Sequence, residues 1–137
     1  MREKQRDKGR IEDIIKYSDN IRQMIDGVSY EMFHDNLLIY YAVMKNVEIV
    51  GEAAYMLSAE FKESHPQTPW KIVQGMRHYL VHGYANIDVH ELYSTAVNDI
   101  PVLKQQAEAY LADTNWNEWE KSDVEPSKQT AYGNITT

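Results

Sequence analysis

Apolar side chains recur at every third or fourth position along most of this 137-residue chain, and only six glycines and four prolines interrupt them. This spacing gathers the apolar residues on one face of an α-helix, whereas a half-buried β-strand needs strict alternation. The chain contains no strand pattern, internal repeat or low-complexity tract. The sequence therefore predicts an all-α fold, built as a bundle of four main helices.

Capping residues, glycines and prolines indicate where these helices begin and end. The first predicted helix spans residues 11–25 and ends before Gly27, and the second spans residues 36–63 and is opened by Asp35 or Asn36. The third spans residues 69–82 and is closed by Gly83, which can take the left-handed conformation. The fourth spans residues 88–112 and is opened by a capping box of Asp88 and Glu91. Pro101 is expected to kink the fourth helix, because its ring blocks a backbone hydrogen bond. The segment VSYEMFHDN reads as a connector or a short helical turn.

The second helix is apolar on every side through the run LLIYYAVM at residues 37–44. A helix of a small monomer normally keeps one face in water, so this run needs cover from two directions. In so small a domain the second cover is expected to be another subunit, which predicts a homodimer.

Length and composition fit one domain over residues 1–113, followed by a tail over 114–137 that loses periodicity and is expected to be mobile unless Trp116 and Trp119 dock it. The absence of cysteine excludes a disulfide framework, a thiolate zinc site and a cysteine nucleophile. The charged start has no apolar segment of a signal peptide behind it, and no apolar run approaches the about 20 residues of a membrane span. We expect a cytoplasmic protein without membrane contact.

The net charge of −7 is concentrated in residues 85–125, which carry nine acidic residues and two lysines, whereas residues 1–84 are nearly neutral. A protein that coats nucleic acid relies on a broad basic face, so this class is disfavoured and no DNA partner is expected. This distribution is compatible with a locally basic site within residues 70–84.

That segment contains GMRHYLVHGY, which holds one arginine, two histidines and two tyrosines but no acid. Arg77 is a permanent cation whose donors suit phosphate, and His82 can act as an acid or base near neutral pH. They lie five residues apart, about 140° around a helix, and so can converge only near a frayed helix end or across a subunit boundary.

His78 and His82 share a face, but they lack a nearby third ligand. We expect neither a metal site nor a cofactor. A histidine at a helix end also has a purely structural use, since it favours the negative end of the dipole.

PWKIVQGMRHYLVHGY, preceded by NVEIVGEAAYMLSAEFKESHP and followed by DVHELYSTAVNDIPVLKQQ, resembles the HEPN superfamily. The resemblance is specifically to the HepT-like branch of bacterial toxin–antitoxin ribonucleases, and it runs from about Ile11 to Ala112. The family pattern of arginine, four residues, histidine, any residue and tyrosine is met by Arg77, His82 and Tyr84. The residue after the arginine is polar in this superfamily and often asparagine in the branch; here it is His78.

This resemblance implies a helical homodimer in which two such motifs face each other and cleave RNA without metal, with Arg77 and His82 as the catalytic residues. It also implies that an MntA-like nucleotidyltransferase antitoxin silences the toxin by attaching AMP to Tyr84. His78 is a candidate for contacting substrate or supporting the site, and packing is its alternative role. The alternative function is a catalytically weak HEPN adaptor or nucleotide-binding module that holds a nucleotidyltransferase.

Two acidic residues on the second helix have two interpretations. Glu48 and Glu52 fit a solvated stripe with Lys45, which is the favoured one. Alternatively, one carboxylate meets Arg77 in the bundle and orients it. Tyr40, Tyr41 and Tyr55 are expected in the core or in an interface.

Overall fold

The computed structural model describes residues 3–122, apart from the side chain of Tyr84. This part of the chain contains helices and turns but no strand, which confirms the predicted all-α fold. The longer helices are α1 (Asp7–Ile25), α3 (Leu37–Tyr55), α5 (Trp70–His82) and α7 (Ile100–Asp113). The shorter ones are α2 (Tyr30–Asp35), α4 (Ala59–Ser64), α6 (Val89–Ser94) and α8 (Trp116–Lys121), with 3-10 turns at Lys4–Arg6 and Tyr84–Asn86 and a π-helical segment at Thr95–Asp99.

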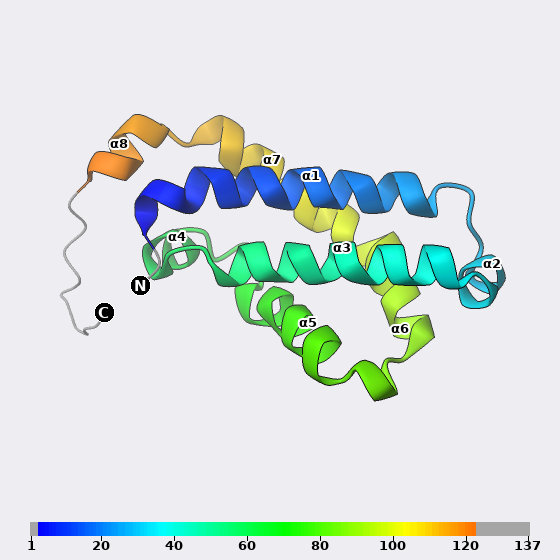
Figure 1. Ribbon diagram of the computed structural model, residues 1–137. Coiled ribbons are helices and arrows are strands. Elements are labelled where there is room, and N and C mark those ends of the chain that lie inside the picture. The colour runs from blue at the N-terminus through cyan, green and yellow to red at the C-terminus, as the bar shows by residue number, and fades with distance from the viewer. Residues whose placement is uncertain (1–2, 123–137) are drawn as a thin grey trace.

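The bundle is organised around the antiparallel pair α1 and α3 (Figure 1). α5 packs against α3, and α7 packs against α1. The core includes apolar side chains from all four longer helices, such as Ile14, Val47 and Leu103, and from shorter ones, such as Phe61 of α4. None of the described helices is long and apolar enough to cross a membrane.

Several predicted helix ends are confirmed. Asn36, rather than Asp35, caps α3, because its side chain accepts hydrogen bonds from the amides of Leu38 and Ile39. Asp88 caps α6 by accepting from the amide of Glu91 at 3.1 Å. Gly27 follows α1 with a φ of 71°, the left-handed region in which glycine is favoured.

The second helix does not run to Glu63 as predicted, because α3 ends at Tyr55 and the chain restarts as α4. Ser58 lies at this break and is fully buried. Its amide and hydroxyl donate to the two carboxylate oxygens of Asp7 at 2.8 and 2.6 Å, and its hydroxyl accepts from the amide of Phe61. The contact with Asp7 uses the amide that a continuous helix would have paired with Ala54, so a long-range interaction decides this helix end.

The fourth helix is interrupted as well, since the π-helical segment Thr95–Asp99 separates α6 from α7. The sequence predicts a kink at Pro101, and the irregular turn is found just before this residue. Pro101 itself lies in the first turn of α7. Proline has no amide hydrogen for the carbonyl four residues earlier, and its ring crowds that carbonyl. A wider π-helical turn accommodates both effects.

The chain after Asp113 begins with a docked helix, where the sequence predicts a loss of periodicity. The indole nitrogen of Trp119 in α8 donates to Asp7 at 3.0 Å, and the ring of Trp116 stacks on Phe61 with centroids 5.9 Å apart. The two tryptophans thus fix α8 to the start of the bundle. Residues 123–137, the rest of the expected tail, lie outside the described residues.

The first turns of α3 remain uncovered within a single chain. Leu37 is 64% exposed and Leu38 is 84% exposed, and Tyr41 on the next turn is also exposed. Val43 and Val47, on the opposite side, are buried. The apolar run at residues 37–44 is predicted to be buried on two sides. Within one chain, neighbouring helices cover only one side of it.

Candidate active site

Arg77 lies on α5 and points at α3. Its Nε donates to the carboxylate of Glu52, and its guanidinium carbon lies 4.9 Å from the centroid of the Tyr55 ring. The side chain is 30% exposed. Arg77 is therefore a cation fixed in orientation, yet within reach of solvent.

Gly51 makes this arrangement possible. A Cβ atom at position 51 would lie 2.8 Å from the Cβ and 2.9 Å from the backbone nitrogen of Arg77, closer than real Cβ atoms approach other atoms. Glycine alone therefore lets α3 and α5 cross at this point. Gly51 is not among the residues predicted from the sequence, although a glycine inside a helical pattern is a signal for close backbone packing.

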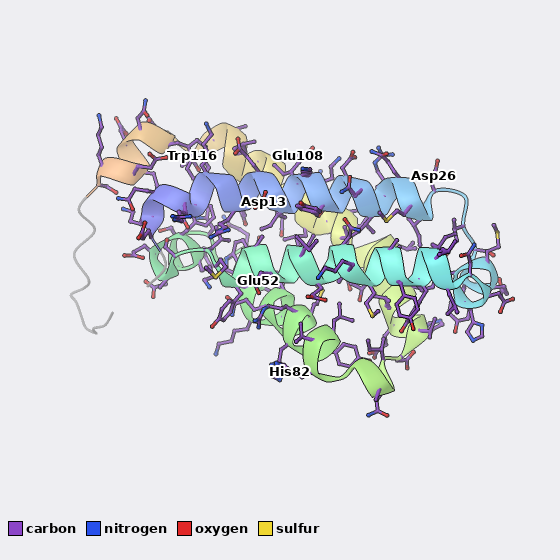
Figure 2. The ribbon with its side chains drawn as sticks, viewed as in Figure 1. Asp13, Asp26, Glu52, His82, Glu108 and Trp116 are labelled. Carbon is purple, nitrogen blue, oxygen red and sulfur yellow. The ribbon has the colours of Figure 1, made fainter. Side chains whose placement is uncertain are left out.

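Glu48 and Glu52 take different roles despite belonging to one polar stripe. Glu48 pairs with Lys45 one turn away at 3.4 Å, as the favoured interpretation states. That interpretation is wrong for Glu52, which pairs with Arg77 on another helix. Figure 2 shows Glu52 where α3 crosses α5.

His78 and His82 lie on the exposed side of α5, with ring centroids 4.6 Å apart. Figure 2 shows His82 near the far end of this helix, away from α3. Arg77 faces α3 instead. Within one chain the guanidinium of Arg77 and the imidazole of His82 therefore lie on different helix faces, which is what their spacing of five residues predicts. Within residues 3–122, no group of three or more candidate ligands is placed to hold a metal ion.

The end of α5 differs from the prediction at Gly83, whose φ of −104° is not left-handed. The glycine is needed for space, because a Cβ there would lie 2.7 Å from the carbonyl oxygen of Tyr79. The Tyr79 hydroxyl accepts from the amide of Asp88 at 2.7 Å and so ties the following turn to α5. Tyr84 opens that turn, and its side chain lies outside the described residues.

These groups supply two chemical capabilities on one helix, although on different faces of it. The fixed guanidinium of Arg77 can bind and neutralise a phosphate, and the exposed imidazole of His82 can accept or donate a proton. α5 itself contains no acidic residue, and the carboxylate that meets Arg77, that of Glu52, comes from α3. The site thus suits an anionic substrate that requires proton transfer.

Comparison with known proteins gives a consistent group of relatives. Residues 14–110 match the family described as Ribonuclease HepT-like. The chain is 35% identical over 101 residues to "Putative RNase MJ1216" of Methanocaldococcus jannaschii, which covers 74% of this chain and 84% of the relative. It is 35% identical over 98 residues to "Probable ribonuclease HepT" of Thermococcus cleftensis, covering 72% and 89%. No solved structure gives a significant match.

Proposed function

The chain belongs to the HepT-like ribonuclease family of the HEPN group, and from this membership we propose that it is a metal-independent endoribonuclease toxin of a toxin–antitoxin pair. The observation that carries the proposal is the placement of the family pattern. Arg77 and His82 fall inside the matched region, on a helix without acidic residues, and both side chains are accessible to solvent.

In the proposed reaction, the 2′-hydroxyl of a ribose attacks the neighbouring phosphorus. The 2′-oxygen gains a bond to phosphorus and loses its proton, the bond from phosphorus to the 5′-oxygen breaks, and that oxygen gains a proton. His82 serves as the base or the acid in this exchange, a contribution worth about 10²–10⁴-fold. Arg77 binds the phosphate and neutralises the charge that builds on its oxygens.

We assign the two proton transfers to two subunits. One His82 acts as the base and its counterpart in a second copy acts as the acid, so the functional unit is a homodimer. The uncovered apolar residues Leu37 and Leu38 support an association of this kind, because exposed patches of large apolar side chains favour burial against a partner.

Control of the toxin is assigned to Tyr84 and a nucleotidyltransferase antitoxin. Tyr84, the tyrosine of the motif, lies on the turn after α5, two residues from His82. An AMP attached there would place a bulky anion where the substrate phosphate belongs, and would block the site by occlusion and by repulsion. His78, whose ring lies next to that of His82, is proposed to contact the RNA or to support His82.

The proposal is tested by His82→Ala in the full-length protein. Purified wild type is expected to cleave RNA in the presence of a metal chelator, whereas His82→Ala is expected to lose cleavage and keep its helical content and oligomeric state. His34→Ala removes an exposed histidine of α2 outside the motif and should cleave like wild type. Cleavage by His82→Ala at the wild-type rate would refute the proposal.

The alternative is a catalytically weak adaptor that holds a nucleotidyltransferase. It is favoured by one observation, the concentration of nine acidic residues in positions 85–125, which suits a protein partner better than RNA. Absence of RNA cleavage by wild type, together with a stable complex with a nucleotidyltransferase encoded by the neighbouring gene, would establish it.

A further inference from the structure

Three residues from about one turn of α3 surround the guanidinium group and the backbone of Arg77; we call Gly51, Glu52 and Tyr55 the arginine cradle. We infer that Glu52 is the positioning residue of this cradle, holding Arg77 by Nε so that both Nη groups are presented to a phosphate of the RNA. This inference rests on the proposed ribonuclease function and adds a residue to its site.

The hydrogen bond to Glu52 uses only one of the donors of Arg77. A guanidinium carries five N–H donors, one on Nε and four on the two Nη atoms. The Glu52 carboxylate accepts a hydrogen bond from Nε, and this bond uses none of the four N–H donors of the two Nη atoms. A forked pair of donors is the arrangement that binds phosphate in a bidentate manner.

The three cradle residues together fix the position and orientation of the Arg77 side chain. Gly51 lets the backbone of Arg77 lie against α3, which sets where the side chain starts. The Tyr55 ring, 4.9 Å from the guanidinium carbon, provides a face on which the planar cation rests. Glu52 then fixes the rotation of the guanidinium group within its own plane. Gly51, Tyr55 and Glu52 therefore each restrain a different motion of the Arg77 side chain.

A competing role for Glu52 would be inhibitory, with its carboxylate competing with phosphate for Arg77. Glu52 is about half exposed, so solvent and salt screen its repulsion of an arriving phosphate. Orientation, by contrast, affects the reacting geometry directly, since a displacement of about 1 Å can cost about 100-fold in rate. The geometry therefore favours positioning over inhibition, and the two roles predict opposite changes in activity.

Steady-state cleavage of a short fluorescent RNA separates these roles. Glu52→Ala is expected to lower kcat by about 10- to 100-fold with a small change in KM, because Arg77 loses its orientation. Glu52→Gln keeps an oxygen that accepts from Nε and should recover most of kcat. Glu48→Gln removes the neighbouring carboxylate that pairs with Lys45 and should behave like wild type. A rise in activity in Glu52→Ala, or equal losses in Glu52→Gln and Glu52→Ala, would overturn the inference.

A second measurement does not depend on catalysis. The Nε–Hε signal of Arg77 in a ¹⁵N NMR spectrum, assigned with Arg77→Lys, should be resolved in wild type and in Glu52→Gln and lost to exchange in Glu52→Ala. If wild type cleaves no RNA, the proposed function fails while this signal still tests the cradle. If Glu52→Ala leaves both the signal and the cleavage unchanged, the inference fails and the proposed function stands.

Discussion

Asp7 joins three segments of the chain through one fully buried carboxylate. It accepts hydrogen bonds from the amide and hydroxyl of Ser58 and from the indole of Trp119. Burial raises the pKa of Asp7 because it disfavours the charged form, although these hydrogen bonds act in the opposite direction. The residue thus links the start of α1 to α4 and α8 while carrying a cost of desolvation.

Asp7→Ala is expected to lower the free energy of unfolding at pH 7 by about 1–3 kcal/mol, because it leaves buried donors without an acceptor. Since the pKa of Asp7 is higher in the folded protein than its usual value of 3.8, the folded state binds the proton more tightly. The stability that Asp7 provides is therefore fully present below pH 3.8 and decreases as the pH rises through its folded pKa. Urea unfolding of both proteins between pH 3 and 7 measures this.

The stability difference between wild type and Asp7→Ala should accordingly be larger below pH 3.8 than at pH 7, because all other titrating groups are shared. A difference that grows with rising pH would show that the hydrogen bonds outweigh desolvation and lower the pKa of Asp7.

Glu48 and Glu52 show what residue spacing can and cannot predict. Both occupy the same polar stripe of α3, and periodicity alone gives them one environment. Only Glu52 lies beside the point where α5 crosses α3, and a crossing is a property of two helices. The sequence could therefore propose the motif residues Arg77 and His82, and it offered Glu48 or Glu52 as a partner for the arginine, but it could not tell which of the two carboxylates pairs with Arg77.

At the scale of the elements, the crossing of α3 and α5 depends on one missing side chain. Gly51→Ala is expected to destabilise the protein, because the overpacking that it forces typically costs about 1–3 kcal/mol. This exceeds the about 0.5–1 kcal/mol that alanine gains over glycine inside a helix. Thermal unfolding followed by circular dichroism measures the change, and RNA cleavage should fall in parallel because Arg77 is displaced.

Gly9→Ala provides the matched control within α1, where a Cβ would meet no atom within 4 Å. It should leave RNA cleavage unchanged and raise the free energy of unfolding by about 0.5–1 kcal/mol. Equal effects of the two substitutions would contradict the tight crossing at Gly51.

At the scale of the whole molecule, the uncovered start of α3 bears on the proposed homodimer. Leu38→Asp places a charge at the most exposed large apolar side chain of the described residues, and is expected to shift the protein from dimer to monomer. Cleavage should fall with it, because the proposed reaction draws one His82 from each subunit. Size-exclusion chromatography with light scattering reports the mass across a range of concentrations.

Val102→Asp is the control, since Val102 is 54% exposed on α7 and tests the same change on another helix. It should keep the oligomeric state and the cleavage rate of wild type. A wild-type protein that is monomeric while active, or a Leu38→Asp variant that stays dimeric, would contradict the proposed assembly.

The fold class, the cap at Asp88 and the helix that carries Arg77 and His82 could be predicted from the sequence, which also narrowed the cap of the second helix to Asp35 or Asn36. These features depend on side chains within one or two helical turns, where periodicity and capping act. The tertiary structure decided where the second helix breaks, how α8 docks and which carboxylate holds Arg77. The contacts of Asp7 span 51 residues to Ser58 and 112 residues to Trp119, distances over which no local pattern carries information. Such contacts exist only in the packed bundle, because packing of the helices brings their partners together.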